Sequence, residues 1–172
     1  MPSLDAKTAN PVKMLYPELD DEIAATRKML ERVPFEHAQW RPHPKSMSLL
    51  QLASHVAQLP DFTTTMAATD VLNFNPEDFK TPPLASTAEL VALFDEKVAK
   101  MRAALAALDW ARLGGNWKMT MGDQVFVDGE RAYLIRHMGI NHIVHHRAQL
   151  GVFLRLLDVP IPGPYGPSAD NI

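Results

Sequence analysis

Residues 129–157, GERAYLIRHMGINHIVHHRAQLGVFLRLL, decide the fold. Several of their side chains recur at intervals of three or four residues, which places them on one face of an α-helix. The segment predicts a helix from about Gly129 to Leu157, capped by Asp128 and ended by the proline-rich stretch at residues 160–164. Its predicted buried face consists of Met138, His142, His146, Gln149, Phe153 and Leu156.

Two segments earlier in the chain have the same period. The first predicts a helix over about Val12–Val33. The second predicts a helix from Leu49, because Ser48 and Gln51 have the spacing of a capping box, in which each side chain accepts a hydrogen bond from a backbone amide at the helix start. Pro60 lacks an amide hydrogen and is expected to bend this second helix.

A third helix is predicted after Ser86 and reaches about Leu108. Residues 114–129 then alternate polar and apolar side chains, which predicts a short β-hairpin. The predicted fold class is therefore all-α: a four-helix bundle with a small β-hairpin between helices three and four. We expect one domain over residues 1–172, with an irregular C-terminal tail at 158–172.

Composition narrows the possible functions. The chain of 172 residues contains no cysteine and has a formal net charge of −3. Disulfides, thiolate metal sites and a cysteine nucleophile are thereby excluded, and the slight acidity argues against nucleic acid as a partner. We recognise no secretory signal and no apolar run near the ~20 residues of a membrane helix, so we expect a cytoplasmic protein without a membrane partner.

Three histidines are placed where a bundle buries side chains. His142 and His146 are four residues apart on the predicted last helix, and His55 lies within the apolar stripe of the second. Buried imidazole nitrogens need partners, and a shared divalent cation satisfies all three rings at once. Zn²⁺ is the first choice for imidazole ligands, with Ni²⁺ or Fe²⁺ as alternatives. A plain bundle whose histidines hydrogen-bond one another is the competing interpretation.

Four stretches of the sequence together have a recognisable pattern: Ser54-His55-Val56-Ala57, NHIVHHRAQL at 141–150, LRLL at 154–157 and the tail PIPGPYGPSAD at 160–170. With these stretches, the sequence resembles the DinB superfamily over nearly its whole length. The resemblance implies a four-helix bundle, usually a homodimer, whose histidine triad binds a divalent metal and corresponds to His55, His142 and His146. Ala148 stands where the family often has glycine. Some relatives transfer low-molecular-weight thiols, and one branch includes a thiol-dependent isomerase.

The expected function is that of a divalent-metal-dependent enzyme acting on a small molecule, with transfer of a cellular thiol as the favoured reaction. A metal-dependent hydrolase and a non-catalytic, metal-binding or stress-related protein are the alternatives. An open site beside a cavity favours catalysis, whereas a fourth protein ligand favours a structural metal. Tyr133, His145 and Gln149 are the candidates for proton transfer or for supporting the ligands.

A homodimer is also expected, because apolar side chains remain on the predicted helix surfaces. These are Val91, Leu93 and Val152.

Overall fold

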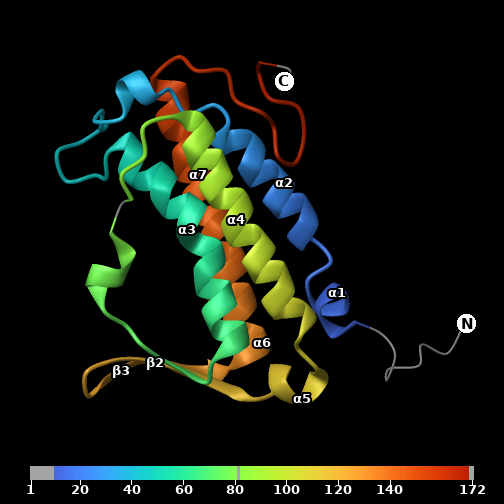
Figure 1. Cartoon of the computed structure of the whole chain (residues 1–172). Helices are drawn as coiled ribbons and strands as arrows, with labels where there is room; N and C mark the ends of the chain where they lie inside the picture. Colours follow the sequence, from blue (N-terminus) through green and yellow to red (C-terminus); the bar gives the residue numbers. More distant parts are fainter. Residues whose placement is uncertain (1–9, 81, 171–172) are drawn as a thin grey trace, which may run out of the picture.

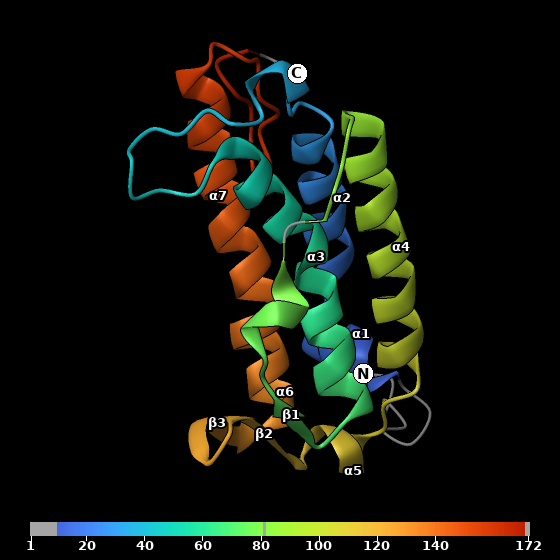
Figure 2. The same ribbon diagram turned by 60° about the vertical axis from the view of Figure 1, so that its left-hand side comes forward.

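Four long helices lie side by side in the computed structural model, which describes residues 10–80 and 82–170 (Figures 1 and 2). They are α2 (Leu19–Leu30), α3 (Leu49–Ala68), α4 (Thr87–Ala106) and α7 (Asn141–Leu156). Shorter helices connect or extend them: α1 (Pro11–Leu15), α5 (Trp110–Leu113), α6 (Arg131–Leu134), the 3₁₀ turns η1 (Phe35–His37) and η2 (Pro76–Phe79), and the π-helix η3 (Ile135–Ile140).

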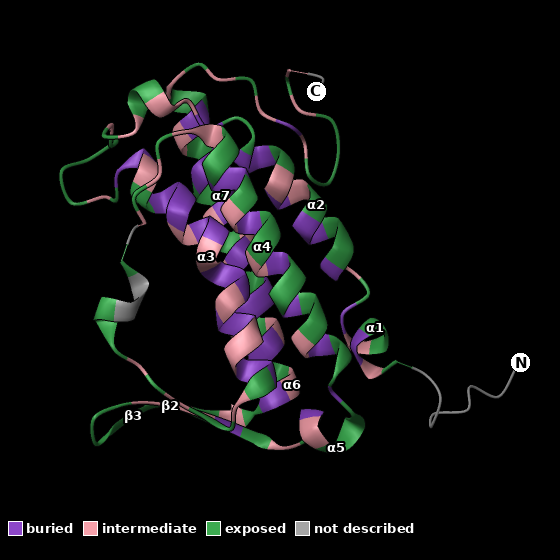
Figure 3. Ribbon diagram, viewed as in Figure 1, coloured by how far each residue is buried: buried purple, intermediate pink, exposed green. Residues whose placement is uncertain are grey.

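The core lies between the four long helices, whose buried faces turn toward one another (Figure 3). Leu30 of α2, Leu49 of α3, Phe94 of α4 and Leu150 of α7 are completely inaccessible to solvent. Removing such side chains from water supplies the main driving force for packing the helices together. The apolar stripes predicted for the earlier helices therefore face the interior. The buried face predicted for the last helix is wrong: Met138, His142, His146 and Phe153 are only half-buried, and Gln149 and Leu156 are exposed. The buried residues of α7 are instead Ile143, Arg147, Leu150, Gly151 and Leu154. Val91 is also buried and Leu93 packs against the core, which leaves Val152 exposed among the three apolar residues expected on the surface.

Helix α3 begins where the sequence predicts. The Ser48 hydroxyl accepts a hydrogen bond from the Gln51 amide, and the Ser48 amide donates to Oε1 of Gln51, which completes the capping box. The helix continues without interruption through Pro60 to Ala68. This start fixes which residues of α3, His55 among them, face α7.

The predicted first and last helices are each divided in the structure. Tyr16 precedes Pro17 and leaves the helical region, because proline disfavours helical geometry in the residue before it, and this separates α1 from α2. The last helix starts at Arg131 and passes through the π-helix η3 before α7. The prediction that Asp128 caps it is wrong: Asp128 lies in strand β3, where it pairs with Lys118 at 2.9 Å.

The predicted all-α fold with a hairpin is wrong, because a third strand makes a mixed sheet. Strand β2 (Asn116–Met121) pairs antiparallel with β3 (Gln124–Glu130), and β1 (Val71–Asn73), directly after α3, pairs parallel with β2. Three residues are too few to show the alternation that marks a strand, so its sequence gives no signal. Trp117 of β2 is fully buried and packs edge-on against Phe62 at 5.8 Å, which closes this end of the bundle.

The irregular C-terminal segment returns along the bundle. Its Tyr165 hydroxyl donates to Glu22 of α2 and accepts from Arg147 of α7, each at 2.8 Å. Asp170 pairs with Arg155 and accepts the Ile161 amide, so the tail is tied to its own helix as well. Across the described ranges, we find no helix of the length and apolar character that crossing a bilayer requires.

Candidate metal centre

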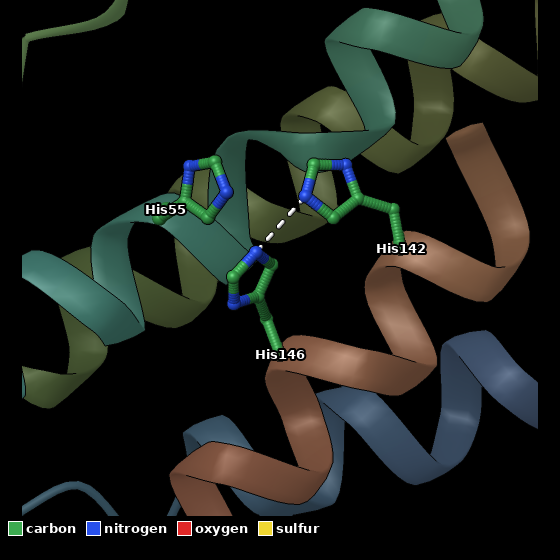
Figure 4. Close-up of side chains that lie close together, drawn as sticks. All are labelled: His55, His142 and His146. Atoms are coloured by element: carbon green, nitrogen blue, oxygen red, sulfur yellow. Dashed lines mark hydrogen bonds between the residues drawn. The ribbon is translucent and has the colours of Figure 1, made fainter.

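Three imidazole rings converge in the groove between α3 and α7. His55 comes from the second turn of α3, while His142 and His146 come from successive turns of α7, and all three rings turn toward one another (Figure 4). One ring nitrogen from each histidine lies within 4.8 Å of the other two, and Nε2 of His142 is 2.9 Å from Nε2 of His146. The three side chains are half-buried, so solvent reaches the cluster.

The close approach of the two helices depends on Gly139. This residue lies in the π-helix η3, one turn before His142, and faces Thr63, two turns beyond His55 on α3. A Cβ atom on Gly139 would lie 2.4 Å from the Thr63 hydroxyl oxygen, well inside van der Waals contact. Glycine therefore allows η3 to touch α3, and this contact brings the start of α7 within reach of His55.

The neighbours of His146 and His142 fix which ring nitrogens face each other. Nδ1 of His146 donates to the amide oxygen of Gln149 at 2.7 Å, because that oxygen only accepts. The His142 ring hydrogen-bonds the backbone of Met138, one turn earlier, and turns its Nε2 toward His146. In the tautomer in which Nδ1 of each neutral ring carries the hydrogen, both Nε2 atoms carry lone pairs and face each other.

The surroundings favour the neutral form of each ring. Burial, aided by the neighbouring histidines, lowers the pKa of His55 to about 4. Burial is also the main cause that lowers the pKa of His142 and of His146, opposed in part by the hydrogen bonds to Met138 and Gln149. Neutral imidazole is the form that binds a metal ion.

These residues fit a divalent cation. In that tautomer the two lone pairs, 2.9 Å apart, repel each other unless a positive charge lies between them. Imidazole nitrogens bound to one tetrahedral Zn²⁺ lie about 3.3 Å apart, so the observed separations need only small side-chain adjustments. Among the side chains that the structure describes, this trio is the one group of at least three potential ligands with metal-site spacing, and it contains no carboxylate.

Of the other three residues predicted for the site, Gln149 and His145 contact His146, and Tyr133 does not belong to the histidine cluster. Gln149 holds the His146 ring, which is a supporting role of the kind expected. The His145 ring packs edge-on against His146 at 4.7 Å but belongs to an exposed side chain. Tyr133 is 60% exposed and stacks on His137 at 5.3 Å, and it is not in the cluster. Whether any of the three takes part in catalysis stays a prediction.

Nearly the whole chain matches one protein family. The DinB family model matches residues 7–171. The chain belongs to the DinB family. Two solved structures of DinB-like proteins resemble it, each with 18% sequence identity and each covering 88% of this chain. For the protein from Bacillus subtilis, 97% of that chain is covered and the TM-score is 0.66. For the protein from Bacillus cereus, 96% of that chain is covered and the TM-score is 0.69. The comparison with curated proteins gives no match.

A cavity of about 360 Å³ adjoins the triad of this DinB chain. His146 and Gln149 belong to its wall, together with Leu52, one turn before His55, and Phe153, two turns after His146. Sequence reasoning missed this cavity, because its lining joins helix faces with the loop before α3, whose path has no periodic signal. The sequence also gave no sign that Arg147, next to His146, is buried and paired with Glu22 at 2.6 Å.

Proposed function

We propose that the protein is a divalent-metal-dependent enzyme whose cation is bound by His55, His142 and His146. The observation that carries this proposal is the convergence of three imidazole nitrogens within 4.8 Å of one another, with Nε2 of His142 and Nε2 of His146 2.9 Å apart. A proton shared by these two rings would bridge the same pair of atoms, but burial lowers the pKa of both rings. The half-buried His55 ring beside them makes a cation the better partner.

Two observations support catalysis over a purely structural metal. Structural zinc sites are normally closed by four protein ligands, whereas catalytic sites use three and leave a position for substrate. Within the described ranges the cluster offers three histidines, and the adjoining cavity gives a small molecule access to it. Zinc is the proposed metal because its preferences match three imidazoles, and nickel or iron is the alternative.

The proposed reaction is the transfer of a low-molecular-weight thiol, and it rests on the family resemblance together with this open site. The bound cation supplies Lewis acidity, which lowers the pKa of a thiol at the site. In the transfer, the thiol proton leaves to solvent, sulfur forms a bond to an electrophilic carbon, and the leaving group departs with its bonding electrons. The chain's own part is to hold three neutral rings in place: Gln149 orients His146, and the backbone at Met138 orients His142.

Thiol consumption tests this proposal. Untagged protein is loaded with zinc, nickel or iron and incubated with cellular thiols and a panel of electrophiles, such as aryl halides and epoxides. We expect thiol loss above the rate of the metal-free protein, abolished by His55→Ala and retained by His37→Ala, which removes an exposed imidazole outside the triad. If no thiol is consumed above the metal-free control, the transferase proposal fails; metal-dependent ester or amide cleavage in parallel assays would favour the hydrolase.

We also propose that the functional unit is a homodimer with a small-molecule substrate and no nucleic-acid or membrane partner. Sedimentation equilibrium is expected to give about twice the chain mass of 19.2 kDa. A mass equal to one chain at micromolar concentration would contradict the dimer.

A further inference from the structure

The cavity beside His146 has one polar end and apolar walls. Its polar end is formed by the His146 ring and Gln149, which the 2.7 Å hydrogen bond links. Its walls are formed by Ser46 and Met47 from the loop before α3, Leu52 of α3, and Val152 and Phe153 of α7, and apart from Ser46 these side chains are apolar. None of the described residues that line it carries a charge at pH 7 if His146 is neutral.

One wall of the cavity is held in place by neighbouring structure. Leu52 is 2% exposed and belongs to the core, so it cannot move without disturbing the bundle. The Phe153 ring packs edge-on against Trp40 at a centroid distance of 5.6 Å, which fixes its orientation. Met47 and Val152, by contrast, are 43% and 59% exposed, so part of their apolar surface is in contact with water.

We infer that this cavity binds an apolar substituent of the ligand whose polar group reaches the triad. The inference rests on the proposed function, since it takes the metal as the point where the polar group binds. His146 belongs both to the triad and to the cavity wall, so the two sites are continuous. A volume of about 360 Å³ is at the lower end of small-molecule pockets, which suits an alkyl or aryl side group rather than a peptide or nucleic acid.

The walls determine which ligands gain affinity. A charged substituent would lose its hydration against Met47, Leu52 and Phe153 without a partner, whereas each methylene moved from water onto these walls gains about fourfold in affinity. The cavity therefore selects ligands with a short, uncharged chain beside the metal-binding group. Affinity should rise with chain length until the cavity is filled and then level off.

A homologous series of metal-binding probes tests this inference. Protein loaded with Co²⁺ in place of the native metal is titrated with n-alkyl hydroxamic acids, from acetohydroxamic to octanohydroxamic acid, and binding is followed by the visible absorption of Co²⁺. We expect affinity to rise about threefold to fourfold per methylene over the shorter members of the series. Met47→Ser and Val152→Ser should reduce this gain, and both positions are exposed enough to tolerate the change.

Leu156→Ser is the matched control. Leu156 is 58% exposed on the same helix as Val152 but does not line this cavity, so its replacement should leave the chain-length dependence unchanged. A protein that binds Co²⁺ but shows equal affinity for all chain lengths would overturn the inference while leaving the metal site intact. The same holds if Met47→Ser and Val152→Ser behave like Leu156→Ser. Absence of Co²⁺ binding would instead overturn the proposed metal site, and this inference with it.

Discussion

Replacing Gly139 by alanine tests how the π-helix positions the triad. The new Cβ atom would lie 2.4 Å from Oγ1 of Thr63, while its next neighbours, Cβ of Thr63 and Cε of Met66, are at an ordinary 3.5 Å. Thr63 is fully buried on α3, so its hydroxyl has little room to move away. We therefore expect Gly139→Ala to push η3 away from α3 and to move the following histidines away from His55.

The size of the effect follows from two opposing terms. Overpacking a buried contact costs about 1–3 kcal/mol, whereas glycine to alanine within a helix gains up to about 1 kcal/mol. A net loss of about 1–2 kcal/mol lowers the melting temperature of a domain of this size by roughly 2–8 °C. The affinity for Co²⁺ should fall in the same variant, because His142 follows Gly139 by only three residues and would move with η3.

Thr63→Ala provides the matched rescue. Oγ1 of Thr63 is buried and has no hydrogen-bond partner in the described structure, so its loss should cost little. The substitution also removes the buried Cγ2 methyl group, so Thr63→Ala alone should cost about 1 kcal/mol. In the double variant the clash is gone, so its stability should be close to that of Thr63→Ala and its Co²⁺ affinity should return to near the wild-type value. Urea denaturation of the metal-free proteins and Co²⁺ titration measure the two quantities. If the stability costs of the two single changes simply add, the steric explanation is refuted.

Three further predictions concern other parts of the fold. Arg131→Met should lower the free energy of unfolding by about 3 kcal/mol or more in urea denaturation, because the buried guanidinium donates to carbonyl oxygens at the ends of α3 and α5; a loss below 1 kcal/mol would contradict this role. Burial raises the pKa of Tyr16 to about 12, so the folded state holds this proton more tightly; stability should be steady below pH 10 and fall by at most about 1.4 kcal/mol per pH unit between pH 10 and 12, and Tyr16→Phe should remove that part of the slope. The Arg155 guanidinium lowers the pKa of Asp170, so tail docking should persist above pH 4 and weaken as the pH falls through the lowered value; Asp170→Asn should speed proteolysis of residues 158–170 at pH 7, and an unchanged cleavage rate would show that this pair does not hold the tail.

The helical period of the sequence was enough to predict that His55, His142 and His146 face other helices. His142 and His146 are four residues apart, and His55 lies among apolar neighbours in a helix whose start is fixed by a capping box. Those two signals place all three rings on inward faces. That the faces meet at the same level of the bundle was not derivable from periodicity, and it came from the resemblance to the DinB superfamily.

The sheet and the π-helix were not predictable for a different reason. Strand β1 spans three residues and is held by pairing with β2, more than forty residues later, so no local pattern marks it. The π-turn at η3 changes the phase of the last helix between Arg131 and His142, and it lies where Gly139 touches Thr63 of α3. Both features depend on partners distant in sequence.

The metal content of untagged protein tests the central claim most directly. Wild-type protein, His55→Ala and His37→Ala are purified without chelators, dialysed and analysed for zinc, nickel and iron. Three imidazoles that share one cation predict about one divalent metal ion per chain in the wild type and in His37→Ala, and loss of most of it in His55→Ala. Protein that stays metal-free after incubation with each metal, or an undiminished ratio in His55→Ala, would contradict the claim.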